Sequence, residues 1–407
     1  MSNKIYPIGI QNFEKIRQDG YFYVDKTALM YQMVKTGSYY FLSRPRRFGK
    51  SLLISTLEAY FQGKKELFAG LMVEKLEKDW IEHPILHLDL NIEKYDVSES
   101  LDNILDKSLT AWEKLYGAEP SERSFSLRFA GIIERAYEKT GQRVVILVDE
   151  YDKPMLQAIG NEDLQKQFRD TLKPFYGALK TMDGCIKFAL LTGVTKFGKV
   201  SVFSDLNNLK DISMDERFVD ICGITEKEIH DNLEEELHQL AEKQKMSYEQ
   251  VCAELKECYD GYHFVEHTIG IYNPFSLLNT FDKMKFGSYW FETGTPTYLV
   301  NLLKKHHYDL ERMAHEETDE QVLNSIDSES SNPIPVIYQS GYLTIKGYDE
   351  RFGIYRLGFP NREVEEGFVR FLLPYYANVN KVESSFEIQK FVREVESGDY
   401  NSFFSRL

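Results

Sequence analysis

The sequence predicts an α/β protein built on a doubly wound parallel sheet, with helices on both faces in a three-layer αβα arrangement. Four short runs are almost continuously apolar, as expected of strands buried on both faces. Long amphipathic segments separate these runs, and strands that alternate with helices indicate βαβ units. The predicted strands are residues 39–43, 84–90, 144–150 and 186–194.

Downstream of about residue 224 the pattern becomes mainly helical. We predict three parts: a nucleotide-binding domain over residues 1–223, a helical region over 224–320, and a winged-helix-like hairpin with C-terminal helices over 321–407. Asn273-Pro274 and Thr295-Pro296 have the N-cap and proline pattern of helix starts. The last three predicted segments are a polar linker at 315–335, a β-hairpin at 341–359 and a helix at 362–376.

Composition excludes several classes of protein. The formal net charge of −15 argues against a protein that coats nucleic acid through its general surface, although a local basic patch stays open. The start of the chain has no apolar signal-peptide region, and no later apolar run approaches the ~18 residues of a membrane span. We therefore predict a cytoplasmic protein without a membrane segment. The four cysteines are irregularly spaced, which favours free thiols: Cys185, Cys222, Cys252 and Cys258.

A phosphate-binding loop is predicted after the first strand. Gly49-Lys50-Ser51 has the G-K-S end of a P-loop, but Arg44 stands where the first glycine is expected. The context is that of a phosphate cradle: a buried strand, a short loop and an amphipathic helix. Lys50 would reach the β- and γ-phosphates and the Ser51 hydroxyl would bind Mg²⁺. The alternative is a chance G-K-S.

A second acidic element follows the strand at 144–150. Asp149 is predicted to hold Mg²⁺, and Glu150 to orient the water that attacks the γ-phosphate. The alternative is a strand that ends in a solvated acidic turn. Thr192, at the end of the fourth strand, could contact the γ-phosphate or cap the next turn. The absence of a guanine-reading N-K-x-D motif favours ATP.

Several arginines surround the predicted cradle. Their position between a strand and its helix favours charge compensation beside a triphosphate over a solvated patch or a nucleic-acid contact. Arg46, Arg47 and Arg217 are candidates for an arginine finger. The predicted nucleotide-binding residues are Arg46, Arg47, Phe48, Gly49, Lys50, Ser51 and Leu52; Glu150, Lys50 and Thr192 are predicted to be catalytic, and Ser51 and Asp149 to bind the metal.

These segments resemble the bacterial AAA-ATPase-like family from about residue 4 to 370. The similar stretches are RPRRFGKSLL, LVDEYDKP, LTGVTKFGKVSVFSDLNNLKDIS, DGYHF, YNPFSLLN, GYLTI and LGFPNREV. The resemblance implies nucleotide binding by Lys50 and Ser51, metal binding by Asp149 and a catalytic Glu150. In that family the loop commonly reads R-x-R-R-F-G-K-S. Many members carry a C-terminal restriction-endonuclease-fold domain, which these 407 residues are expected to lack.

The sequence thus predicts a Mg²⁺-dependent ATPase that couples nucleotide state to a conformational change, with a protein partner or a homo-oligomer as its target. One alternative is a nucleotide-dependent binding module that scarcely hydrolyses ATP. Another is DNA association through residues 330–375, where basic and acidic side chains are mixed.

Overall fold

The fold is known from a computed structural model of the chain. It describes residues 4–196, 206, 208–293, 299, 302–303, 316–324 and 332–376.

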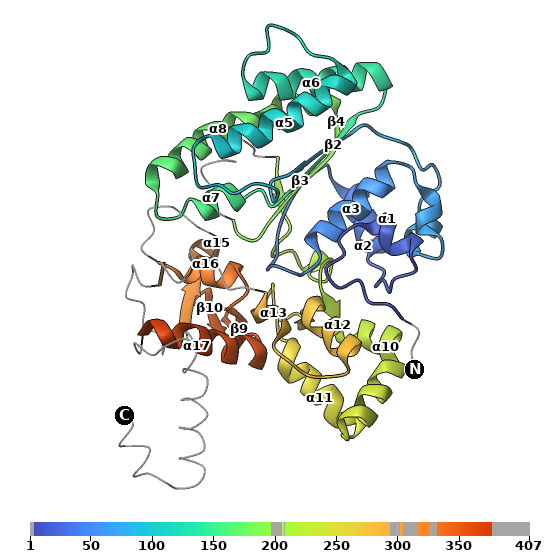
Figure 1. The fold of residues 1–407 in the computed structure, drawn as a ribbon, viewed down its shortest axis with the longest axis vertical. Coiled ribbons are helices and arrows are strands. Elements are labelled where there is room, and N and C mark those ends of the chain that lie inside the picture. The colour runs from blue at the N-terminus through green and yellow to red at the C-terminus, as the bar shows by residue number, and fades with distance from the viewer. Residues whose placement is uncertain are drawn as a thin grey trace.

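A five-stranded parallel sheet forms the centre of the N-terminal half (Figure 1). The strand order is β2-β3-β4-β1-β5. This confirms the predicted doubly wound α/β fold and its four strands, whereas the short β5 was not predicted. The strands are β1 (Tyr39–Ser43), β2 (Ile85–Asp89), β3 (Val144–Asp149), β4 (Ile186–Gly193) and β5 (Lys210–Asp211).

Burial along the strands depends on their place in the sheet. Every residue of β1 and β3 is buried, as predicted. The prediction of burial on both faces is wrong for β2, in which buried and half-buried residues alternate. β2 is an edge strand with one neighbour, so one of its faces is less completely covered.

Helices cover both faces of the sheet and enclose two separate hydrophobic clusters. α5, α6 and α8 lie over one face, where the Phe129 and Phe175 rings stack at 4.4 Å, and α1 to α3 lie over the other (Figure 1). The bounds of these helices are α1 (Phe13–Gln18), α2 (Thr27–Thr36), α3 (Lys50–Phe61), α4 (Met72–Leu76), α5 (Glu99–Tyr116), α6 (Phe125–Thr140), α7 (Lys153–Gln157) and α8 (Glu162–Thr181). Short 3₁₀ turns are η1 (Lys65–Phe68), η2 (Asp183–Cys185) and η3 (Glu216–Phe218).

The next region has its own hydrophobic cluster between its helices. The predicted helix start at Asn273 is confirmed, because its side-chain oxygen accepts hydrogen bonds from the amides of Phe275 and Ser276. The start predicted at Thr295-Pro296 lies outside the described residues. The elements are β6 (Ile224–Thr225), α10 (Glu226–Gln244), α11 (Tyr248–Tyr259), β7 (Ile271–Tyr272), α12 (Pro274–Lys283) and α13 (Tyr289–Glu292).

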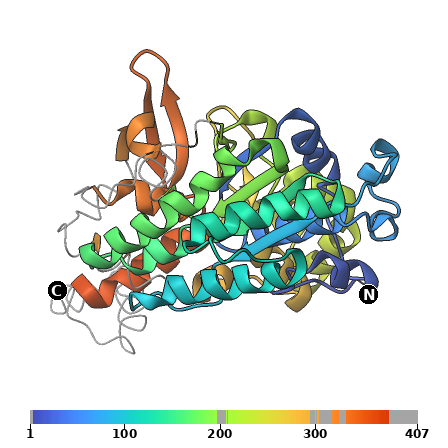
Figure 2. The ribbon, with the colours of Figure 1, turned by 90° about the horizontal axis from the view of Figure 1, so that it is seen from above.

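A three-stranded antiparallel sheet, in the order β8-β10-β9, characterises the last described region, and its β9–β10 hairpin projects from the body (Figure 2). The predicted hairpin and following helix are confirmed. The predicted linker is wrong for residues 316–324, which form a strand and a helix because β8 pairs with β10, a long-range contact that local composition does not reveal. The elements are β8 (Glu316–Asp319), α15 (Glu320–Asn324), α16 (Ile334–Gln339), β9 (Thr344–Asp349), β10 (Ile354–Gly358) and α17 (Arg362–Tyr376).

Two further predictions concern membrane spans and disulfides. Over the described residues of the chain, no helix is both long enough and apolar enough for a membrane span. All four cysteines are free thiols.

Candidate functional site

The predicted site residues converge at the carboxyl edge of the parallel sheet. β4 lies between β1 and β3, so the loop after β1 and the acidic residues after β3 both border the end of β4. Ser43 at the end of β1 pairs with Gly193, and Val148 near the end of β3 pairs with Leu191. Ligands of open α/β sheets bind at this edge.

The P-loop leads into α3 through a glycine in the left-handed conformation. Gly49 has φ +96° and is the N-cap of α3. The first backbone bond of the helix runs from the Leu53 amide to the Gly49 carbonyl at 2.9 Å. The amides of residues 49–52 consequently have no acceptor within the helix, and such an amide cluster at a helix start favours an anion. This is the arrangement that a phosphate cradle requires.

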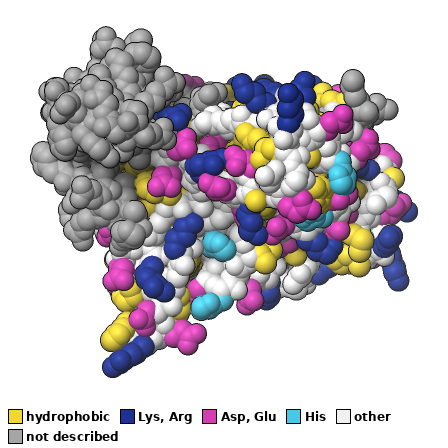
Figure 3. Space-filling model, turned by 90° about the horizontal axis from the view of Figure 1, so that it is seen from below, with side chains coloured by type: hydrophobic (Ala, Val, Ile, Leu, Met, Phe, Trp, Pro, Cys, Tyr) yellow, Lys and Arg dark blue, Asp and Glu magenta, His cyan; other side chains and the backbone are white. Residues whose placement is uncertain are grey.

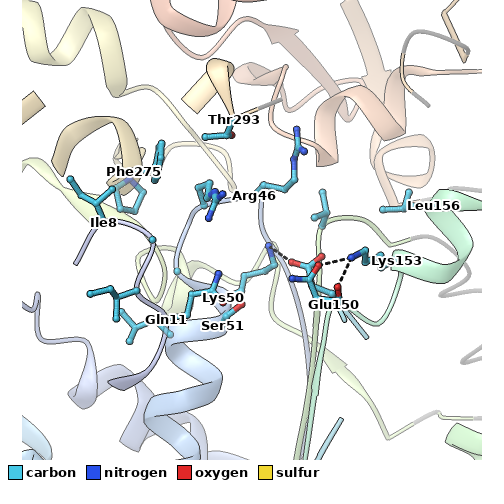
Figure 4. Close-up of a pocket in the computed structure, with 18 of the residues that line it drawn as sticks. Ile8, Gln11, Arg46, Lys50, Ser51, Glu150, Lys153, Leu156, Phe275 and Thr293 are labelled. Atoms are coloured by element: carbon cyan, nitrogen blue, oxygen red, sulfur yellow. Dashed lines mark hydrogen bonds and ion pairs between the residues drawn. The ribbon is translucent and has the colours of Figure 1, made fainter. Parts of the chain in front are cut away.

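Lys50 and Glu150 face each other at the base of the site (Figure 4). The Lys50 Nζ lies 3.6 Å from Glu150 Oε1 and donates hydrogen bonds to the carbonyls of Arg44 and Pro45 at 3.1 and 3.3 Å. Glu150 has φ +55°, a conformation that costs a non-glycine residue about 1–2 kcal/mol. The fold therefore holds the Glu150 carboxylate beside the P-loop lysine at some cost in backbone energy.

Asp149 and Thr192 lie behind this pair. The Thr192 hydroxyl donates to Asp149 Oδ1 at 2.6 Å, and the Glu150 amide donates to the same oxygen at 3.1 Å. Thr192 is fully buried, so it orients the Asp149 carboxylate in this arrangement and does not line the cavity.

The residues present fit a Mg²⁺ ion held jointly with a nucleotide. Asp149 is buried and does not itself line the cavity, whereas the adjacent Glu150 and Ser51 do. The second carboxylate oxygen of Asp149 has no hydrogen-bond donor among the described residues. Mg²⁺ commonly takes one or two carboxylates together with phosphate oxygens and waters. No group of three or more potential metal ligands occurs among the described His, Cys, Asp and Glu residues, so the protein alone does not form a closed metal cage.

Arg44 points away from the site, and the predicted charge compensation is wrong for this residue. The residue is 1% exposed, and its guanidinium donates to the carbonyls of Ser43, Ser213, Phe218 and Val219 at 2.8–3.4 Å. Burial lowers its pKa below the ordinary value. Because Pro45 restricts the preceding residue to extended conformations, Arg44 continues the line of β1 and its side chain enters the interior.

The other basic residues differ in placement. Arg46 and Arg47 line the cavity, as does Leu52. The Phe48 side chain is buried in the core, so only its backbone is available to a ligand. Arg217 lies outside the cavity lining and forms an ion pair with Asp215, which removes it as an arginine finger for this site within the same chain.

The cavity measures about 770 Å³ and has an apolar wall that the sequence did not indicate. The apolar wall includes Ile8 from the N-terminal segment 7–11 and Phe275 from α12, and the polar Gln11 of the same segment also lines the cavity (Figure 4). On the acidic side, the Lys153 Nζ donates to both oxygens of Asn91 at 2.7 Å. The motifs LVDEYDKP and YNPFSLLN contain Lys153 and Phe275, but only the fold brings them to one cavity.

Asp152 is a buried carboxyl group that the sequence reading missed. It is fully buried and accepts hydrogen bonds from the Thr195 amide and hydroxyl at 2.6 and 2.7 Å. It also faces Gly193, where an added Cβ would lie 2.6 Å from Asp152 Oδ1. Burial, and next the charge of Glu150, raise its pKa to about 7. Asp152 thus ties the turn after β3 to the end of β4.

The free energy of unfolding of the wild type, relative to Asp152→Asn, is expected to fall as the pH rises from about 4 to about 7. In the folded protein the Asp152 carboxyl keeps its proton up to about pH 7. In the unfolded chain the same carboxyl is deprotonated above about pH 3.9. Between these values the folded state binds more protons, so rising pH favours unfolding. Urea denaturation of both proteins at several pH values measures this, and parallel curves would contradict it.

Among the described residues, the basic side chains of the C-terminal hairpin and helix are only partly paired with acids: Arg370 forms an ion pair with Glu366, whereas the Arg351 guanidinium lies over the Phe352 ring. Arg362 pairs with Glu254 and Glu257, and the Lys346 Nζ donates to the Pro360 carbonyl at 3.0 Å. Basic and acidic side chains are interspersed over the described part of the face in Figure 3. A basic footprint for DNA is therefore not evident on this face of the described chain.

Comparison with known proteins identifies the family. A family model described as predicted AAA-ATPase matches residues 7–203, which include the P-loop, Asp149-Glu150 and Thr192. A curated relative from Azotobacter chroococcum mcd 1, described as an uncharacterized protein in the vnfD 5′ region, is 40% identical over 381 residues, which are 92% of this chain and 71% of that protein. The chain belongs to the predicted AAA-ATPase family. Membership of this AAA-ATPase-like family supports an ATP-binding P-loop module.

One solved structure in the comparison is AMPPCP-bound DnaA from Aquifex aeolicus. It is 10% identical and covers 95% of this chain and 92% of its own, with a TM-score of 0.31. At that score the likeness carries no argument about the fold or the function of this chain.

Proposed function

We propose that the chain is a Mg²⁺-dependent ATPase whose nucleotide site is the cavity above the P-loop. One observation carries the proposal: the start of α3, the Lys50 side chain and the Glu150 carboxylate border a single cavity at the carboxyl edge of the sheet. Three phosphates would lie along the amides of residues 49–52. The apolar wall opposite, with Ile8 and Phe275, would take the base.

Each protein group has a separate role in hydrolysis. Glu150 would orient a water for in-line attack on the γ-phosphorus and accept its proton, while the bond to the β-phosphate oxygen breaks. Lys50 would leave the carbonyls of Arg44 and Pro45 to bind the β- and γ-phosphates. When bound through Ser51 and Asp149, Mg²⁺ would neutralise charge on the phosphate oxygens. Thr192 would hold Asp149 in the orientation that this binding needs.

Hydrogen bonds and strand pairing along the chain support the proposed division into three domains. At the first boundary, residues 223 and 224, the Gly223 amide still donates to the Phe48 carbonyl at 3.0 Å, whereas Ile224 pairs with Tyr272 in a separate sheet. Residues 224–320 would form the helical domain around their own hydrophobic cluster. From 321 onward, with β8 just before, the order β8-α15-α16-β9-β10 favours a winged-helix-like unit.

The second candidate is a nucleotide-dependent binding module with little turnover. The observation that favours it is the contact between Lys50 and Glu150, because the lysine holds the proposed base in an ion pair. In such a module, nucleotide binding alone would set the state offered to a protein partner or a second copy. Comparing binding with turnover separates the two candidates.

Lys50→Ala is expected to weaken the binding of a non-hydrolysable ATP analogue by at least about tenfold. The reason is the loss of a charge-assisted contact to phosphate, which is worth about 1.5–3 kcal/mol. Isothermal titration calorimetry in the presence of Mg²⁺ measures the effect. Lys227→Ala is the control, because that lysine is 82% exposed on α10. Equal affinity of the wild type and Lys50→Ala would refute the assignment of the cradle.

A further inference from the structure

The residues in front of the G-K-S triplet are packed against a region more than 200 positions downstream. Every one of residues 44–48 contacts a residue between 262 and 341. The pairs are the Arg44 guanidinium with the Phe264 ring at 4.0 Å, Pro45 with Gly341, the Arg46 carbonyl with Trp290 Nε1 at 2.9 Å, the Arg47 guanidinium with the Phe275 ring at 5.2 Å, and the Phe48 and Tyr262 rings at 4.8 Å.

The contact to the Arg46 carbonyl is the most specific of the five. Trp290 is 3% exposed, and its backbone amide donates to Glu363 Oε1 at 2.7 Å and to Ser276 Oγ at 3.0 Å. The backbone of Trp290 is therefore held by residues from α12 and α17. The indole N–H fixes the peptide between Arg46 and Arg47, and Arg47 has φ +66°. This strained turn comes directly before the amides of the cradle.

The winged-helix-like unit, which begins near residue 321, also contacts the loop formed by residues 44–48. Gly341 has φ +87°, and an added Cβ there would lie 2.6 Å from Pro45 Cβ. α16 precedes it, with five of its six residues buried, and the Lys196 amide donates to Gln339 Oε1 at 2.6 Å. α16 therefore packs against the nucleotide-binding domain. A helix that reads DNA would instead face solvent.

We propose that the five downstream residues that contact the loop shape the nucleotide cradle directly, with Trp290 as a positioning residue for ATP binding; they are Tyr262, Phe264, Phe275, Trp290 and Gly341. This inference rests on the proposed function of the cavity as a nucleotide site. A loop held at five successive residues can adjust to a triphosphate only if its downstream partners adjust with it. Binding of nucleotide and the arrangement of this region are then coupled, and such coupling is reciprocal. Residues 44–48 thus connect the nucleotide site to the C-terminal half of the chain.

Trp290→Phe tests the positioning role. It removes the indole N–H donor and keeps an aromatic ring in the same place. The non-hydrolysable ATP analogue is expected to bind about fivefold to tenfold more weakly, the loss that corresponds to one hydrogen bond. Trp80→Phe is the matched control, since the Trp80 Nε1 is buried without a hydrogen-bond partner among the described residues. That variant should bind within twofold of the wild type.

Thermal denaturation of both variants separates positioning from simple instability. Equal melting temperatures with weaker binding only in Trp290→Phe support the inference, and equal affinity of the two variants overturns it. If Trp290→Phe does not fold, Glu363→Gln takes its place, because it weakens the anchor of the Trp290 amide without changing the indole. A wild type that does not bind the analogue refutes the proposed function itself, which is a different outcome.

Hydrogen exchange of the wild type tests the coupling. The analogue is expected to slow exchange of backbone amides in segments 260–291 and 334–345 as well as in the P-loop. Amides of α5 and α6, which lie on the other face of the sheet from α3, are the internal control. Protection confined to residues 44–53 would overturn the coupling, because the cradle would then bind nucleotide without its downstream partners.

Discussion

Glu150→Gln is expected to bind ATP as well as the wild type and to hydrolyse it about 10²–10⁴ times more slowly. Glutamine keeps the size and the hydrogen-bonding reach of the side chain but cannot accept the proton of the attacking water. The substitution also removes the ion pair at 3.6 Å to Lys50, so the lysine becomes freer to engage phosphate. Affinity should therefore stay equal or increase. Calorimetry with the ATP analogue and single-turnover phosphate release measure the two effects.

The control for this variant is Glu162→Gln, which changes an exposed glutamate at the start of α8. Its turnover should match that of the wild type. Unchanged turnover in Glu150→Gln would remove this residue as the base. If the wild type binds ATP but shows no measurable hydrolysis, the binding-module candidate replaces the ATPase.

Arg44→Gly restores the first glycine of the usual P-loop pattern, yet we expect it to destabilise the protein by about 3 kcal/mol or more. The arginine guanidinium donates to four backbone carbonyls in a fully buried position. Glycine would remove the guanidinium donors of these carbonyls, of which that of Phe218 keeps the Ile221 amide as a donor. It would also open a cavity beside Phe264 and add backbone entropy to the unfolded chain. Affinity for ATP should not improve, because the arginine does not line the nucleotide cavity.

Urea denaturation measures the loss, and two further variants calibrate it. Arg44→Lys keeps the charge but not the planar fork of donors, so an intermediate loss is expected. Arg217→Ala changes a side chain that is 51% exposed and should stay within about 0.5 kcal/mol of the wild type. An Arg44→Gly protein that is as stable as the wild type, or that binds ATP more tightly, would mean that the arginine is merely tolerated.

Much of the fold follows from local pattern. The four apolar runs became β1 to β4 within one residue at each end, because strands buried in a parallel sheet need continuous apolar residues. The asparagine cap of α12 and the hairpin at 344–358 were also predictable from short signals. The sequence did not predict β5, β6, β7 and β8, since a strand of two to four residues is defined by its pairing partner and not by its own composition.

The sequence by itself predicted the residues of the proposed site: a lysine and a serine at a helix start, and a D-E pair after a buried strand. Each of these two motifs is a short run of adjacent residues that follows a buried strand, so it can be recognised from local spacing alone. Only the tertiary structure decided the direction of Arg44, the apolar wall from Ile8 and Phe275, and the contacts of residues 44–48 with Tyr262, Trp290 and Gly341. Such contacts join residues separated by more than 200 positions, and side-chain packing in three dimensions leaves no periodic signal along the chain.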